Sequence, residues 1–187
     1  LDQRATHDFI ILNDEAYDWL ANMFNEIEAG APWLEPALHA KCAYPLKDPD
    51  GKGDPLCYRV LHVMSVAYRR WAATRLRQCN DLIGESATLD MVAGIAGMSA
   101  EEAWYSTAIL IERAKLQGKP ATGASVDIHK CFDQLVRELL YEILEEAGSP
   151  EELLIAYKSF LENIVVHNFI NGHVGQGHSH RCGVPQG

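Results

Sequence analysis

The chain has 187 residues, of which 48% are apolar and 22% charged, and its formal net charge is −10. This length and composition exclude a disordered chain and predict one globular domain, or one and a half, with a core of its own. The negative charge argues against a general polyanion binder, since phosphate contacts need Lys and Arg, and no apolar run approaches the roughly 20 residues that cross a bilayer.

The cysteines are spread along the chain and include no CxxC pair. They are Cys42, Cys57, Cys79, Cys131 and Cys182. This spacing favours free thiols over a disulfide framework or a structural zinc site, so we expect an intracellular, reducing compartment, either nucleus or cytoplasm. We also expect an excerpt of a longer chain, because the sequence begins at Leu1 and stops at Gly187 within a motif.

The first half of the chain is predicted to contain two helices that flank an extended segment. Residues 14–29 repeat apolar side chains at helical spacing after Asn13, which is a good N-cap. Residues 41–61 look extended, apart from a turn-rich interruption at 47–55. A basic helix is predicted over residues 62–82.

Three more helices are predicted in the second half. Ser99 and Glu102 form a capping box for a helix that ends near Gln117. Residues 133–146 carry apolar side chains on one side. The sequence Ser149-Pro150-Glu-Glu152 combines an N-cap, a proline at the first helical position and a capping-box Glu, so a last helix runs to about residue 163.

Two extended segments close the chain. Residues 164–170 and 174–182 read as a hairpin around Asn171-Gly172, a pair typical of tight hairpin turns. Helices therefore dominate the prediction. The predicted fold class is α+β, helix-rich with a small antiparallel sheet.

The residues most suggestive of chemistry are Asp-Ile-His-Lys-Cys-Phe-Asp, from Asp127 to Asp133, which follow a short apolar segment, 122–126. We expect residues 124–126 to form a strand, because a sheet edge would aim the Asp127 carboxylate rigidly. Mg²⁺ prefers carboxylates together with substrate phosphates. Asp127 is therefore a candidate metal ligand beside a nucleotide. For Asp133 we favour a role at the N-terminus of the next helix.

A group of imidazoles and a thiol lies near the end of the chain: His173, His178, His180 and Cys182. In an extended hairpin, residues 178, 180 and 182 share one face, which resembles a set of zinc ligands. A closed tetrahedral site, however, needs four ligands with turn-compatible spacing. A polar strand face is therefore the favoured interpretation.

Asp127 to Asp133 resembles the first catalytic motif of reverse transcriptases, and Gly183-Val-Pro-Gln186-Gly187 resembles their second. The two occur in the family's order and at a separation that the family shows. Upstream, Pro45-Leu-Lys47, Tyr58-Arg59-Val-Leu and Tyr68-Arg-Arg-Trp71 resemble the fingers segment of non-LTR (LINE-like) retrotransposon enzymes. The family usually has Pro-Ile after the position of Arg59, where this chain has Val60-Leu61.

The resemblance implies the fingers and partial palm of a right-hand polymerase, with the thumb and the rest of the palm absent. Residues 1–120 would be the fingers and the start of the palm, and residues 121–187 a partial palm with both motifs. The implied activity is RNA-directed DNA polymerisation, in which dNTPs are added to a DNA primer 3′-hydroxyl on an RNA template. The implied cofactor is Mg²⁺, two ions, with Mn²⁺ as a substitute.

The resemblance also implies roles for single residues. Asp127 would be one of the carboxylates that bind the two Mg²⁺ ions, and Ile128 would offer a backbone carbonyl. The Phe132 ring would lie under the sugar of the incoming nucleotide and exclude a 2′-hydroxyl. The residues implied to contact the triphosphate are Lys47, Arg59 and Lys130, and those implied to line the nucleotide and template pocket are Gln186 and Gly187.

The family's third motif, an aromatic-Ala-Asp-Asp turn that supplies the other metal-binding acids, does not occur in this sequence. We expect it beyond Gly187, and we expect residues 1–187 alone not to polymerise. Three alternatives stay open. They are a group II intron or retron-type enzyme, a decayed element that catalyses nothing, and a helical interaction module in which Asp127 is only a cap.

Overall fold

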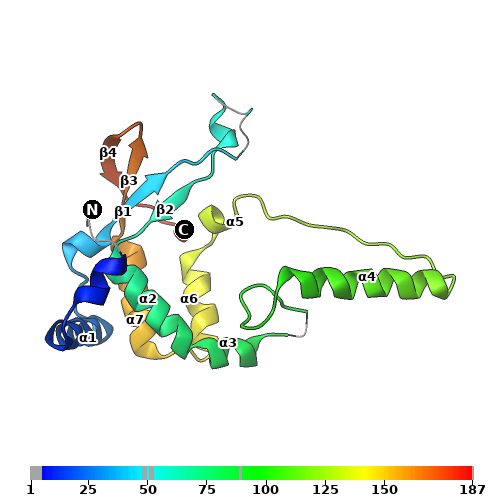
Figure 1. Ribbon diagram of the computed structural model, residues 1–187, viewed down its shortest axis with the longest axis horizontal. Coiled ribbons are helices and arrows are strands. Elements are labelled where there is room, and N and C mark those ends of the chain that lie inside the picture. Colours follow the sequence, from blue (N-terminus) through cyan, green and yellow to red (C-terminus); the bar gives the residue numbers. More distant parts are fainter. Residues whose placement is uncertain (1–5, 48–49, 51–52, 89, 187) are drawn as a thin grey trace. The chain divides into compact units, whose positions relative to one another are not determined.

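The computed structural model describes residues 6–47, 50, 53–88 and 90–186. The chain forms two compact units, one of residues 1–75 with 130–187 and one of residues 76–129 (Figure 1). The predicted division at residues 120 and 121 concerns polymerase subdomains and stays a prediction.

The larger unit contains a four-stranded sheet in the order β2-β1-β3-β4. The strands are β1 (His39–Ala43), β2 (Leu61–Val63), β3 (Val165–Ile170) and β4 (His173–His178). β1 pairs with β2 and β3 with β4 in antiparallel fashion, whereas β1 and β3 are parallel. The α+β class is confirmed, but the sheet is mixed and not wholly antiparallel. Hairpin signals reveal only local antiparallel pairs, and a parallel pair needs a long connection.

The hairpin between β3 and β4 turns where the sequence predicts. Asn171 and Gly172 have φ angles of 50° and 83°, which are the positive values that a tight type I′ turn requires at both central residues. The second strand ends at His178. It is therefore shorter than the predicted segment 174–182.

Helices pack below the sheet in Figure 1. The α-helices of the larger unit are α1 (Asp14–Glu28), α2 (Val66–Gln78, which continues into the smaller unit), α5 (Cys131–Gln134), α6 (Arg137–Glu146) and α7 (Glu151–Asn163). The 3-10 helices that the described residues show in full are η1 (Thr6–Ile11), η2 (Glu35–Leu38) and η4 (Pro55–Cys57). As predicted, the side chain of Asn13 caps α1 by accepting a hydrogen bond from the Ala16 N–H at 3.0 Å.

The predicted basic helix over residues 62–82 is wrong at both ends. Its first residues form β2, because they pair with β1 instead. The helix begins after Ser65, whose hydroxyl accepts a hydrogen bond from the Tyr68 N–H at 3.2 Å. It ends at Gln78, and a separate helix, α3 (Asn80–Ser86), follows.

The predicted helix over residues 133–146 is interrupted. Leu135 and Val136 have extended backbones between α5 and α6. The carbonyl of Leu135 accepts a hydrogen bond from the Gly183 N–H at 2.8 Å, so it is taken by a residue 48 positions further along the chain. The next helix, α7, begins at Glu151 without a side-chain cap, and the predicted cap at Ser149 is absent.

The core is centred on the buried ring of Trp33. Its ring meets Tyr68, Trp71 and Phe160 at centroid distances of 5.6, 5.4 and 5.6 Å, all edge to face. Phe160 also stacks on Tyr68 at 3.4 Å. The indole N–H of Trp33 donates to the Ala156 carbonyl at 2.9 Å, so the polar group of the ring is satisfied. These contacts join α2 and α7 to the loop after α1.

A buried carboxylate connects two helices at this core. Glu28, at the end of α1, accepts a hydrogen bond from the Trp71 indole at 2.6 Å and a two-pronged contact from the Arg75 guanidinium at 2.5 Å. A buried carboxylate is stable only when it is paired and hydrogen-bonded. The contact therefore fixes α1 against α2.

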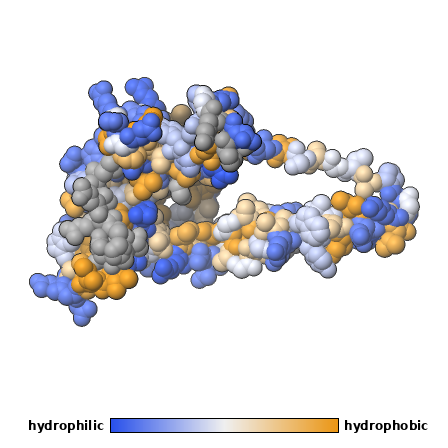
Figure 2. All heavy atoms as spheres, turned by 45° about the horizontal axis from the view of Figure 1, so that its top comes forward, coloured by the Kyte–Doolittle hydropathy of each residue, from blue (hydrophilic) through white to orange (hydrophobic). Residues whose placement is uncertain are grey.

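The smaller unit contains α3 and α4 (Ala100–Leu116). The predicted capping box of α4 is present, with the Ser99 N–H donating to Glu102 at 2.7 Å. None of the side chains of α4 is buried, and apolar atoms are visible along it at the right of Figure 2. No helix in the described part of the chain is long and apolar enough to cross a membrane.

The strand predicted at residues 124–126 is not present. Residues 119–128 belong to no helix or strand, and the side chains of 121–128 are exposed. A strand needs a neighbour for its backbone N–H and C=O groups, and none of the described strands pairs with this segment. The predicted sheet-edge placement of Asp127 is therefore wrong for the structure described.

We predict that Phe160→Ala destabilises the protein by about 3–5 kcal/mol, because the ring is fully buried between Trp33 and Tyr68. Ile155→Ala on the same helix is the matched control, and it should cost about 1 kcal/mol or less because Ile155 is exposed. Urea unfolding followed by circular dichroism measures both. Equal losses would show that the aromatic cluster is not the core.

Candidate functional site

The two segments that resemble catalytic motifs are joined through their backbones. The Val184 N–H donates to the Phe132 carbonyl at 2.9 Å, and the Gly183 N–H donates to the Leu135 carbonyl at 2.8 Å. Phe132 belongs to the first motif and Gly183 opens the second. The structure therefore brings together residues that are about 50 positions apart in sequence.

Gly183 allows this close approach. Its φ is +79°, and a Cβ atom at this position would lie 2.8 Å from the carbonyl oxygens of both Phe132 and Asp133. Real Cβ contacts with backbone oxygens are not that short, and L-residues rarely adopt such a φ. Only glycine satisfies both conditions, so the first residue of the second motif is fixed by packing.

The side chain of Arg137 also binds the backbone of the loop that contains Gly183. Its side chain is only 2% exposed. Nε donates to the Gly183 carbonyl at 2.8 Å and Nη1 donates to the Leu161 carbonyl at 2.6 Å, while the Glu162 carboxylate lies 3.5 Å from Nη1. Sequence reasoning missed this residue, because an Arg in an amphipathic helix normally lies on the polar face.

Gln186 reaches the sheet through its backbone. Its carbonyl accepts a hydrogen bond from the His62 N–H of β2 at 2.6 Å. The Gln186 side chain is exposed. Gly187, which the resemblance implies as a further pocket residue, lies outside the described residues.

Lys47 and Arg59 lie on the two arms of an extension of the β1–β2 hairpin, on either side of the bridge between Leu46 and Tyr58. The Lys47 N–H donates to the Cys57 carbonyl at 2.7 Å, and the Arg59 N–H donates to the Pro45 carbonyl at 2.8 Å. Both side chains are exposed, and the Lys47 ammonium lies 3.2 Å from the Leu56 carbonyl. Two of the three implied triphosphate contacts thus come from one exposed hairpin.

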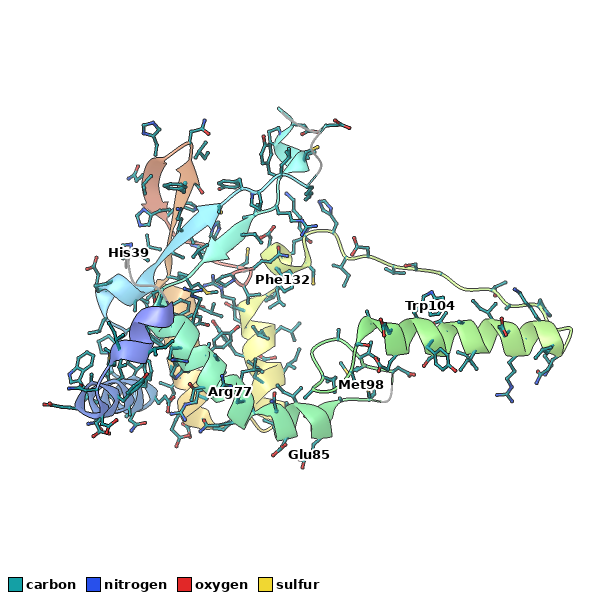
Figure 3. All side chains as sticks on the ribbon, in the orientation of Figure 1. His39, Arg77, Glu85, Met98, Trp104 and Phe132 are labelled. Carbon is teal, nitrogen blue, oxygen red and sulfur yellow. The ribbon has the colours of Figure 1, made fainter. Side chains whose placement is uncertain are left out.

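Lys130 and Phe132 lie at the start of the short helix α5. Lys130 has a φ of 49°, and its carbonyl accepts hydrogen bonds from Asp133 and Gln134 at 3.0 and 3.1 Å. Asp133 is in the first turn of α5, as predicted. The Phe132 ring is 47% exposed beside that turn (Figure 3), so its face is accessible to a ligand.

Asp127 and Ile128 belong to the smaller unit, and both are exposed. Gln186 belongs to the larger unit. The implied metal role of Asp127 and the implied pocket role of Gln186 therefore stay predictions. Among the described residues, no group of three or more His, Cys, Asp or Glu side chains is placed to hold a metal ion.

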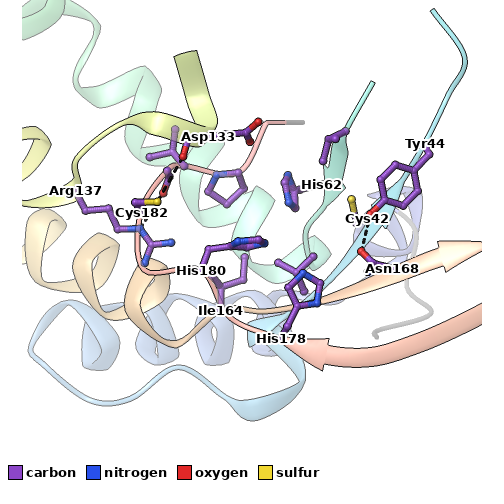
Figure 4. A pocket seen from close by; sticks show the side chains of 15 residues that line it. Cys42, Tyr44, His62, Asp133, Arg137, Ile164, Asn168, His178, His180 and Cys182 are labelled. Carbon is purple, nitrogen blue, oxygen red and sulfur yellow. Dashed lines mark hydrogen bonds between the residues drawn. The ribbon is translucent and has the colours of Figure 1, made fainter. Parts of the chain in front are cut away.

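A pocket of about 180 Å³ lies beside the second motif (Figure 4). Residues of β1, β2 and β3 line it on one side, and Asp133, Arg137, His178, His180 and residues 182–185 line the rest. In this lining, the Tyr44 hydroxyl donates to Asn168 Oδ1 at 2.6 Å. Burial, followed by the neighbouring Cys42, raises the pKa of Tyr44 to about 12, so this hydroxyl stays protonated.

Three imidazoles, those of His62, His178 and His180, line this pocket. Burial, and then the nearby His180, lower the pKa of His62 below its usual value. Burial and the nearby His178 likewise lower the pKa of His180, although Asp133 opposes this for both rings. Below-normal pKa values mean that both rings are neutral at pH 7. The pocket therefore offers neutral nitrogen donors and acceptors.

Comparison with models of known protein families finds no match for this chain. Comparison with curated proteins likewise finds no significant match.

We predict that Gly183→Ala costs about 1–3 kcal/mol more in unfolding free energy than Gly172→Ala. Both glycines have a positive φ, but a Cβ at Gly172 meets nothing within 4 Å, whereas one at Gly183 collides with two carbonyls. Urea unfolding measures the difference. Amide hydrogen exchange at Val184 should also accelerate in the Gly183 variant only, and equal behaviour of the two variants would contradict the docking described above.

Proposed function

We propose that this chain is the fingers and part of the palm of an RNA-directed DNA polymerase of the LINE-like type. The reaction would be template-directed transfer of dNTPs to a primer 3′-hydroxyl, with an RNA template and a DNA primer as partners. Residues 1–187 would supply part of the active site, and a third motif beyond Gly187 would supply the rest.

The observation that carries this proposal is the convergence of separate segments that resemble one family. The second motif contacts the first motif through Gly183 and Val184, and contacts β2, which follows Arg59, through Gln186. The resemblance of each segment rests on residue identity alone and is independent of any contact between them. Chance resemblances scattered along a chain have no reason to pack against one another.

The chemistry required matches the residue types at these positions. Phosphoryl transfer depends mainly on positioning and on stabilising negative charge. Asp127 would supply one carboxylate to the Mg²⁺ ions, whose role when bound is to stabilise the attacking and leaving oxygens. The resemblance implies that the third motif supplies the carboxylates still needed.

The exposed cationic side chains have the charge that is needed to bind the triphosphate of a dNTP. Arg59 offers a planar fork for two phosphate oxygens, and Lys47 offers a point charge on the opposite arm of the same hairpin. Lys130 would add a third cation next to the first motif. The partly exposed Phe132 ring would lie under the sugar and exclude a 2′-hydroxyl.

The alternative functions predict different sequences after Gly187. A group II intron or retron-type enzyme would share these motifs, and a decayed element would have lost the third motif or one of its acids. An intact Ala-Asp-Asp turn in frame beyond Gly187 supports an enzyme.

We predict that Asp127→Ala lowers primer extension about a thousandfold or more in a longer chain that carries the third motif. The loss of one metal-binding carboxylate removes several kcal/mol of transition-state stabilisation. Asp90→Ala, which removes another exposed carboxylate of the same unit, is the control and should leave the rate unchanged. Substantial extension by a folded Asp127→Ala protein would refute the metal role.

We predict that Phe132→Ala in the same longer chain raises ribonucleotide incorporation relative to deoxynucleotide incorporation by roughly 10–100-fold. Removal of the ring opens space for a 2′-hydroxyl. The ratio of kcat/KM for matched rNTP and dNTP measures this, with Phe169→Ala on β3 as the aromatic control. Unchanged sugar selectivity would remove this role from Phe132 without touching that of Asp127.

A further inference from the structure

Three histidines from distant parts of the sequence meet at the pocket beside the second motif. His62 lies on β2, His178 ends β4, and His180 follows two residues later. The ring centroids of His62 and His180 are 6.4 Å apart, and those of His178 and His180 are 4.9 Å apart. In Figure 4 the His180 ring lies between the other two, and all three line the same cavity.

His62 lines this cavity, and its ring carries a buried polar atom without a hydrogen-bond partner. The residue is only 7% exposed, and its Nδ1 has no hydrogen-bond partner. An unpaired buried polar atom costs about 1–3 kcal/mol. Such an orphan in a pocket lined by two further imidazoles indicates that a ligand completes the site.

The backbone of His62 is fixed beside the second motif. Its backbone N–H donates to the Gln186 carbonyl at 2.6 Å. A neutral imidazole carries a lone pair on one of its two ring nitrogens, and this lone pair is what binds a metal ion.

We propose that His62, His178 and His180 form a binding site for a divalent transition-metal ion of the zinc class. Three imidazole ligands leave one position open to water, an arrangement that Zn²⁺ accepts.

The geometry requires only side-chain adjustment. Two imidazoles on one tetrahedral Zn²⁺, with Zn–N bonds of about 2.0–2.1 Å, place their ring centroids roughly 5 Å apart. The pair His178–His180 already has this spacing, whereas His62 and His180 must approach. In their present rotamers, no three such side chains of the described chain are arranged to hold a metal ion. His178 is half-buried and His180 exposed, so both rings can turn toward the fixed His62.

The bound ion would tie β2 to the segment that leads into Gly183, and it would thereby stabilise the second motif on the sheet. The proposal does not depend on polymerase activity. Cys182 is not included, because its thiol is directed to the Asp133 carbonyl at 3.6 Å.

The test is a titration of the full 187-residue chain with Zn²⁺ at pH 7, followed by isothermal calorimetry. One strong site is expected, and His180→Ala should weaken it about tenfold or more, since even the loss of a group that supports a ligand costs 10–100-fold. His173→Ala is the control, because His173 is an exposed histidine of the same hairpin that does not line the pocket. Both substitutions are at exposed positions, so they should leave the fold intact, which circular dichroism checks.

His178→Ala should weaken binding as His180→Ala does, and both variants should lose the rise in Tm that Zn²⁺ gives the unaltered chain. The absence of a strong site in the unaltered chain would overturn the proposal. So would equal affinities of His180→Ala and the unaltered chain, or an equal loss in His173→Ala. A tenfold loss in Cys182→Ser would also overturn it, because the thiol would then be a ligand of a different site.

Discussion

The guanidinium of Arg137 joins three parts of the larger unit that are far apart in sequence. It donates to the Gly183 carbonyl and to the Leu161 carbonyl at the end of α7, while its own backbone starts α6. A buried cation that loses its acceptors costs about 3–5 kcal/mol, so these acceptors cannot move independently. The position of the second motif therefore depends on this one side chain and on the glycine that lets the backbones meet.

Helix caps and turns that depend only on residues close in sequence could be predicted from the sequence. The Asn13 cap, the Ser99–Glu102 capping box and the Asn171–Gly172 turn each involve residues within four positions, and all three are present. The parallel pairing of β1 with β3 and the break at Leu135 depend on residues more than 40 positions away. Local patterns contain no information about such partners, which is why the sheet was predicted as antiparallel and the helix as continuous.

The candidate site shows the same limit. The sequence pattern singled out the residues of both motifs but not Arg137, because the apolar side of residues 133–146 predicts a buried face to which a charged residue does not belong. Three apolar side chains of this segment, Val136, Leu139 and Ile143, are exposed. Periodicity identifies an apolar face, but not which neighbour covers it. The Leu135 carbonyl accepts a hydrogen bond from the Gly183 N–H, so α6 starts only at Arg137. The Arg137 guanidinium then lies beside backbone carbonyls of the core. Likewise, His178 and His180 gave a weak signal alone, since His62 is more than 110 positions earlier.

The absence of a strand before Asp127 bears on how the proposed active site would be completed. A carboxylate holds a metal ion firmly only when its backbone is fixed, and an extended segment is fixed by pairing with another strand. Residues 119–128 have no such partner among the described residues. Under the proposed function, the metal role of Asp127 would therefore require a pairing partner for residues 119–128 that the described strands do not provide.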